Sequence, residues 1–212
     1  MVTGFSYTSN PNGVWTYDYN LGTETPYTSG QGASNQLGTG LPGWWTGVTC
    51  CPPPESLIIL QNTTGSTVNF STVHVPTNNL WLDPESGNVS ITFTAPSAGT
   101  YSVSGNFLGV DVNENSLLIE ILDNGSVAWS GTLTSYEQDE PFNFSESLNT
   151  GGTITFEVAE GTGTYGGCVY CYLGTGLDAS ISATPELSSV LLFGSGLLGL
   201  IPLLRRKRFR HS

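Results

Sequence analysis

Lysine and arginine are absent from the first 204 of the 212 residues, and this absence is the most informative feature of the composition. All seventeen Asp and Glu residues precede the first Lys or Arg, and the formal net charge is −12. Nucleic-acid binding requires basic side chains that neutralise phosphates, so the acidic body excludes that class of function. An acidic surface of this kind keeps a protein soluble or attracts cations.

Sustained helical periodicity is also missing from residues 1–180, where alternating and β-branched runs recur instead. In 88–94 and again in 153–159, every second residue is apolar, which is typical of a half-buried strand. The predicted strands lie near Val14 and at 56–60, 67–70, 88–94, 100–107, 117–122, 127–131, 142–148, 153–159 and 177–182. Short strands in this number predict an all-β fold, an antiparallel β-sandwich of jelly-roll type, with an immunoglobulin-like sandwich as the alternative.

The turns support this fold class. Asn124-Gly125 separates two apolar runs, and this dipeptide tolerates the positive φ angles of a type I′ turn. We therefore expect a tight hairpin at this point.

The C-terminus differs from the body. Residues 190–204 carry no charge, and a helix over about 187–204 would be about 27 Å long, enough to cross a hydrocarbon core. The basic residues of the tail, 205–212, follow at once: Arg205, Arg206, Lys207, Arg208 and Arg210. We expect a single C-terminal hydrophobic helix in the membrane, with its basic end in the cytoplasm. The alternative is a buried core helix.

Pro185-Glu186, the apolar run "LLFGSGLLGL" and the terminal "RRKR" together resemble a PEP-CTERM sorting signal. The resemblance implies a Gram-negative bacterium, export, recognition by an exosortase-type membrane enzyme and removal near Pro185. It also implies a place at the cell surface or in the exopolysaccharide matrix of a biofilm. Position 187 is Leu where the family name implies Pro. The predicted division is an exported domain, 1–183, and a sorting signal, 184–212.

Export also requires a start signal. Residues 1–20 contain neither the basic n-region nor the apolar h-region of a signal peptide. We therefore expect a signal peptide upstream of residue 1. The alternative is a cytoplasmic protein with a C-terminal tail anchor, which would violate the positive-inside rule.

The body from Leu80 to Ile181 resembles the carbohydrate-binding-module-like jelly rolls of secreted bacterial proteins. The phrases "FTAPSAGTYSVSGNF", "ILDNGSVAWSG", "LNTGGTITFEVA" and "GLDASI" carry this resemblance. It implies that Asp178, in "LDASI", helps to hold a structural calcium ion, for which carboxylate oxygens are suitable ligands. The alternative is that Asp178 is an ordinary acid at a strand end. No other cofactor is expected.

Four cysteines form two pairs in the sequence: Cys50 with Cys51, and Cys168 with Cys171. Adjacent cysteines make a poor zinc knuckle, and the second pair does not open a helix as in a redox site. In an exported protein the even number predicts two disulfides. They either join the two loops over a long range or close one vicinal ring and one local ring.

Aromatic residues surround these cysteines. If the disulfides join the loops, one rim would gather Trp44, Trp45, Tyr165, Tyr170 and Tyr172. Flat aromatic faces stack on sugar rings, so this rim is the predicted glycan-binding site, with exopolysaccharide as the ligand. The alternative is a small core that closes the open end of the sandwich. Trp81 and Trp129 lie in strand patterns and are predicted core residues.

A catalytic constellation is not recognisable in the sequence, and the chain is predicted not to be an enzyme. His74 is the only histidine before the tail, and it lies in a strand pattern. The "NEN" of 113–115 and the "EQDE" of 137–140 are interpreted as solvated acidic loops. A structural matrix component without a discrete ligand is one alternative function, and a glycan hydrolase that uses paired carboxylates is another.

Overall fold

The computed structural model describes residues 4–28, 31–36, 38–47, 57–85, 87–159 and 172–184, and the regular elements of these residues are strands. In chain order they are β1 (Trp15–Asn20), β2 (Glu24–Pro26), β3 (Gly32–Gln36), β4 (Leu41–Trp45), β5 (Ile58–Gln61), β6 (Val68–Phe70), β7 (Val73–Val75), β8 (Leu80–Asp83), β9 (Asn88–Thr94), β10 (Gly99–Gly109), β11 (Leu117–Asp123), β12 (Ser126–Leu133), β13 (Asp139–Leu148), β14 (Thr153–Ala159) and β15 (Thr175–Ala183).

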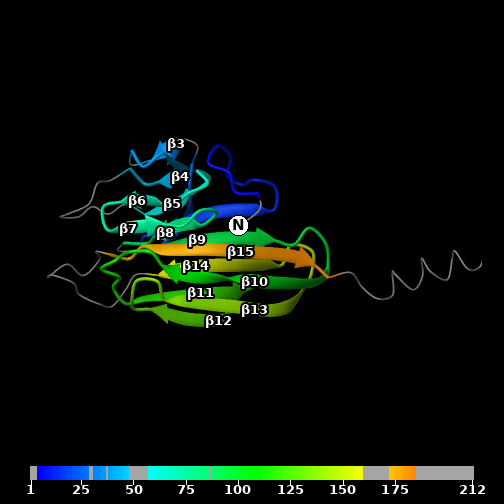
Figure 1. The fold of residues 1–212 in the computed structure, drawn as a ribbon. Coiled ribbons are helices and arrows are strands. Elements are labelled where there is room, and N and C mark those ends of the chain that lie inside the picture. The colour runs from blue at the N-terminus through cyan, green and yellow to red at the C-terminus, as the bar shows by residue number, and fades with distance from the viewer. Residues whose placement is uncertain are drawn as a thin grey trace, which may run out of the picture.

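The strands form two packed antiparallel sheets, and the strands of both sheets run across the view in Figure 1. One sheet has the order β12-β11-β14-β9-β1-β2, and the other has the order β13-β10-β15-β8-β5-β4-β3. If only strands β8 to β15 are considered, the first sheet has the order β12-β11-β14-β9, and it faces a second sheet with the order β13-β10-β15-β8. This is the strand order of a jelly roll. The predicted all-β antiparallel sandwich of jelly-roll type is therefore confirmed.

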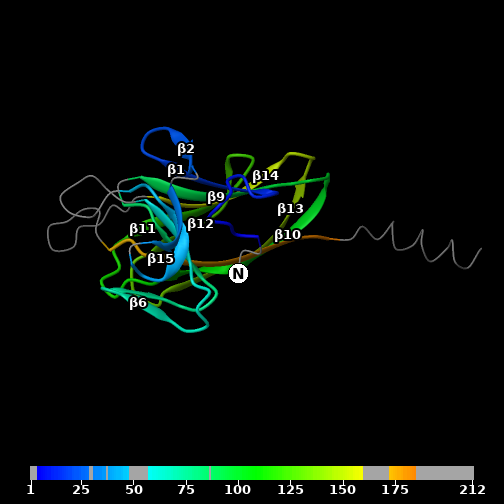
Figure 2. The same cartoon turned by 90° about the horizontal axis from the view of Figure 1, so that it is seen from above.

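The earlier strands extend this jelly roll. β1 and β2 widen the first sheet beyond β9, and β5, β4 and β3 widen the second beyond β8. The hairpin β6–β7 forms a separate two-stranded sheet. Seen from above, this hairpin and the β1–β2 hairpin lie on opposite sides of the molecule (Figure 2).

The main core lies between the two sheets. In β9 the side chains of Val89, Ile91 and Phe93 are buried, and the alternate apolar residues of β14 are buried in the same way. The alternation read from the sequence is thus confirmed in both strands. A second apolar cluster, which contains Trp81, Val73 and Val110, lies on the outer side of the seven-stranded sheet under the β6–β7 hairpin. Trp81 is buried there, as predicted.

The hairpin between β11 and β12 turns at Asn124 and Gly125, whose φ angles are +46° and +80°. Positive values at both positions agree with the predicted type I′ turn. Asn124 Oδ1 also accepts a hydrogen bond from the Thr153 amide at 3.1 Å, which ties the turn to the start of β14.

The sandwich has two distinct ends. At one, which we call the loop end, β4, β8 and β10 finish and β11 and β15 begin. At the other, the far end, β15 finishes at Ala183, opposite Tyr101 of β10. Figure 1 shows the loop after β10 on the left and the end of β15 on the right. Because β10 has eleven residues, the two ends are about 35 Å apart.

The predicted C-terminal helix and the basic tail lie outside the described residues. Among the residues that the structure does describe, no helix has the length and apolar character needed to span a bilayer.

Candidate functional site

Trp44, predicted on the glycan-binding rim, is a core residue. Its indole is completely buried, stacks between Tyr17 and Tyr27 at 6.0 Å centroid separations, and donates from Nε1 to the Ser6 main-chain oxygen at 2.8 Å. No face of the ring is open to a sugar, so the prediction is wrong for this residue. The reason is that side chains alternate along β4: Trp44 points between the sheets, and Trp45 points to the opposite face of its sheet.

Trp45 and Tyr172 are the other described members of the predicted rim, and both are half-buried at the loop end. Trp45 pairs with Ile58 and Ile58 pairs with Asp83, while the next residue back, Leu82, pairs with Thr175 at the start of β15. Three strand spacings, about 14 Å, therefore separate Trp45 from the start of β15. The structure brings both aromatics to one end of one sheet. Tyr165 and Tyr170 lie outside the described residues.

A third aromatic residue at the loop end was not predicted. Tyr136 lies between β12 and β13, and its hydroxyl is 3.0 Å from Nδ1 of His74 on β7. The two rings meet edge to face at 5.5 Å. Residues 135–138 are held beside β10, because the Glu137 amide donates to the Gly109 oxygen at 2.9 Å. Since 62 positions separate His74 from Tyr136, no local pattern could have indicated the pair.

Acidic side chains lie between these aromatics. Glu114 and Asn115 are each 8% exposed and Asn113 is half-buried, so the interpretation of "NEN" as a solvated loop is wrong. The nearby Asp111 is 3% exposed. Glu114 Oε2 accepts a hydrogen bond from the Asp111 amide at 3.1 Å, which folds the side chain back into the protein. Burial, with smaller contributions from Asp111 and Asp83, raises the pKa of Glu114 to about 9.

Several polar atoms near Glu114 are buried without a hydrogen-bond partner. They are Glu114 Oε1, Asn115 Nδ2, Thr175 Oγ1 and, on the outer side of the sheet, Trp81 Nε1. Buried polar atoms normally have a protein or water partner, so unpaired ones require an explanation. These four are most of the buried side-chain N and O atoms without a partner in the part of the chain that the structure describes; the fifth is Tyr27 Oη.

A second group of carboxylates lies on the outer face of the six-stranded sheet. Glu120 is directly opposite Glu157, and the same row continues through Ser90 to Asp18. Burial, followed by repulsion from Glu24, raises the pKa of Asp18 to about 6. The pKa of Glu157 is also raised, by burial and then by Glu120, while Asn88 donates a hydrogen bond to it at 3.1 Å.

Asp178, the predicted calcium ligand, is half-buried on the outer side of β15, opposite Asn106. Across the described ranges, no three or more His, Cys, Asp and Glu side chains are grouped to hold a metal ion. A calcium ion at Asp178 stays a prediction. The four cysteines, Pro185-Glu186 and the basic residues of the tail lie outside the part of the chain that the structure describes.

Comparison with known proteins gives a fold-level resemblance only. No family model and no curated protein matches the chain. Among solved structures, the chain is similar to a family 35 carbohydrate binding module from Clostridium thermocellum, with 13% identity over 67% of this chain and 88% of that chain, and a TM-score of 0.30. It is similar to CBM35 from Paenibacillus barcinonensis, with 16% identity, 59% and 98% coverage and a TM-score of 0.31.

A third similar structure is CBM51 from Clostridium perfringens GH95 in complex with methyl-galactose. Identity is 13%, coverage is 59% of this chain and 80% of that chain, and the TM-score is 0.37. At these values no residue role is transferred to this chain, and the functional argument rests on its own geometry.

Proposed function

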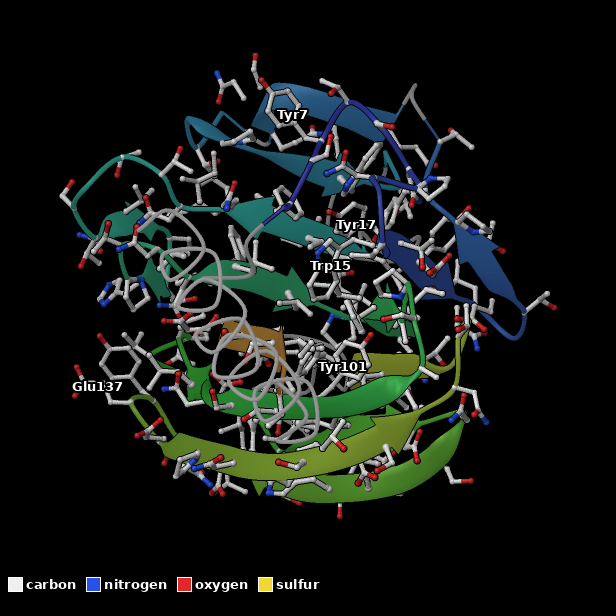
Figure 3. The ribbon with its side chains drawn as sticks, turned by 90° about the vertical axis from the view of Figure 1, so that its right-hand side faces the viewer. Tyr7, Trp15, Tyr17, Tyr101 and Glu137 are labelled. Carbon is white, nitrogen blue, oxygen red and sulfur yellow. The ribbon has the colours of Figure 1, made fainter. Side chains whose placement is uncertain are left out.

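We propose that this chain is an exported surface or matrix protein whose loop end binds a neutral polysaccharide without cleaving it. The observation that carries the proposal is the difference between the two ends of the sandwich. Half-buried aromatics and carboxylates gather at the loop end, whereas the described chain finishes at Thr184, at the far end. Figure 3 looks onto that far end, where Tyr101 lies near the centre. A domain held by its C-terminus would present the loop end away from the membrane.

The side chains of the loop end are chemically suited to sugars. Trp45, Tyr136 and Tyr172 provide flat apolar surfaces with polar edges, of the kind that stack on sugar rings. Carboxyl groups form hydrogen bonds with sugar hydroxyl groups, and Asp83 and Glu137 lie near these aromatics. Ligand sites of this kind combine apolar faces with a few fixed polar groups.

Charge restricts the class of ligand. No Lys or Arg occurs before residue 205, and the acidic residues Glu85, Asp111 and Glu137 lie at the loop end. Uronate, sulfate and phosphate groups would be repelled there. The expected ligand is therefore a neutral glycan.

A glycan array probed with the full chain in mild detergent tests the binding. We expect signals on neutral oligosaccharides and none on uronate-containing or sulfated ones. An array with no signal above background would refute binding and leave a structural matrix component as the function. Release of reducing sugar from a bound glycan would instead establish a hydrolase.

Export and sorting are tested separately. We propose that an exosortase-type enzyme recognises the C-terminal segment and that processing occurs near Pro185 and Glu186. The mass of the protein recovered from the cell surface should then correspond to a chain that ends close to Pro185. An intact C-terminus in the cytoplasmic fraction would refute this part of the proposal.

A further inference from the structure

We propose that the glycan site is an aromatic row, formed by Trp45, Phe70 and Tyr136, which runs across the outer side of the seven-stranded sheet at the loop end. This inference rests on the proposed glycan binding, and it narrows the ligand to an extended chain of several sugar rings. Phe70 is the new member of the site. It lies on β6 and is 37% exposed, an unusual degree of exposure for a phenyl ring.

The Phe70 ring is supported from below. It contacts the indole of Trp81 on β8, with ring centroids 6.0 Å apart and planes inclined at 46°. Trp81 is 2% exposed, so the buried indole holds the phenyl ring over β8 while part of that ring stays in solvent. A supported and partly exposed ring is suited to stacking on a flat ligand.

A second exposed apolar side chain lies near Phe70. Val112 is 42% exposed, and its amide donates to the Thr72 main-chain oxygen at 3.0 Å. Thr72 is in the turn between β6 and β7, two residues after Phe70. Because Val112 follows β10, this turn lies at the loop end, and Figure 1 shows β6 and β7 on the same side as the loop after β10.

The β6–β7 hairpin also connects Phe70 to Tyr136. On β7, Nδ1 of His74 is 3.0 Å from the Tyr136 hydroxyl, and His74 is directly opposite the exposed Asn69, the neighbour of Phe70 on β6. His74 and Asn69 project from one face of the hairpin, and Phe70 projects from the other, at its β6 edge. The Asn69 amide and the Tyr136 hydroxyl are therefore polar groups beside the row that can bond sugar hydroxyl groups.

The strand order sets the spacing of the row. Trp45 is on β4 and packs against the same outer cluster as Trp81 on β8, whereas Tyr136 lies beside the end of β10. β5 separates β4 from β8, and β15 separates β8 from β10. Phe70, over β8, is therefore two strand spacings, about 10 Å, from the strand positions of both Trp45 and Tyr136.

This spacing selects the ligand. The row is about 20 Å long, four strand spacings, so a monosaccharide or a disaccharide cannot contact all three rings. A linear neutral glycan in an extended conformation can do so, with some sugar rings stacked on aromatics and the intervening ones bonded to polar side chains. Affinity should therefore increase with the length of the chain.

The test is isothermal titration calorimetry of the full chain in mild detergent, with a length series of the best neutral glycan from the array. Affinity should rise from the disaccharide to at least the tetrasaccharide, and the hexasaccharide should bind about 30-fold more tightly than the disaccharide, because it contacts two more rings. Phe70→Ala should bind the hexasaccharide about 5-fold more weakly than the wild type does.

Three further variants complete the test. Phe70→Tyr keeps a flat ring and should bind as the wild type does. Val127→Ala should do the same, because it removes an exposed apolar side chain from β12 next to the Asn124-Gly125 turn, at the far end. If Phe70→Ala does not fold, Phe70→Leu replaces it, since leucine keeps an apolar contact with Trp81 but has no ring, and the same loss is expected.

The outcomes separate this inference from glycan binding itself. Equal affinities for the disaccharide and the hexasaccharide would overturn the aromatic row and leave glycan binding in place. Unchanged hexasaccharide affinity in a folded Phe70→Ala or Phe70→Leu variant would overturn it as well. If no member of the series binds, the proposed function is refuted, and this inference with it.

Discussion

Replacing Asp18 with Asn should make the protein more stable at neutral pH and leave its stability unchanged in acid. Asp18 is 7% exposed and lies on β1, on the outer face of the six-stranded sheet. Burial and the nearby Glu24 carboxylate raise its pKa from 3.8 to about 6. Ionising Asp18 is therefore harder in the folded chain than in the unfolded one.

The sign and size of the effect follow from proton linkage. Because the folded-state pKa is the higher one, the stabilising contribution is complete below pH 3.8 and is lost as the pH rises from 3.8 to about 6. A shift of about 2 pKa units corresponds to an upper limit of about 3 kcal/mol in the free energy of unfolding. Asn cannot ionise, so the variant avoids this loss above pH 6.

The assay is urea unfolding of both chains at pH 4, 5, 6 and 7, followed by tryptophan fluorescence. The difference between Asp18→Asn and wild type should increase with pH and level off above pH 6. Asp139→Asn, at an exposed acid on β13, is the matched control for the chemical change itself. A difference for Asp18→Asn that is the same at every pH would refute the reasoning, because it would reflect a lost contact and not ionisation.

Four further substitutions have expected outcomes. Trp44→Ala should lower the free energy of unfolding by about 3–5 kcal/mol in urea titrations, because it removes a completely buried indole, whereas Trp45→Ala should cost clearly less. Tyr136→Phe, which removes the hydroxyl that meets His74, should cost about 1 kcal/mol in the same assay. Gly125→Val should destabilise the β11–β12 hairpin, because valine resists a φ of +80°, and faster hydrogen exchange in β12 would show this.

The sequence predicted the strands best where their pattern was local. The bounds of β9 and β14 match the expected ranges, because an unbroken alternation of apolar residues defines both strands. β3 and β4 were missed, since glycine and proline interrupt "GASNQ" and "LPGWW". β8 was missed because four residues are too few to show a period.

The candidate site could be predicted only in part, because its contacts are long-range. Tryptophans in "GWWTG" gave no sign that Trp44 would stack between Tyr17 and Tyr27, which come from other segments of the chain. In the same way, the acidic "NEN" segment looked solvated, and only the fold shows that Glu114 is turned back onto the Asp111 amide.

The most direct test of the central claim is the affinity of the loop end for the best neutral glycan found on the array. Titration calorimetry would compare the wild-type chain with a Trp45→Ala, Tyr136→Ala double variant and with Tyr7→Ala, which removes a half-buried aromatic from the N-terminal segment. Loss of stacking at about 1 kcal/mol for each ring predicts that the double variant binds about 30-fold more weakly. Tyr7→Ala should bind as the wild type does. Unchanged affinity in a correctly folded double variant would contradict the account.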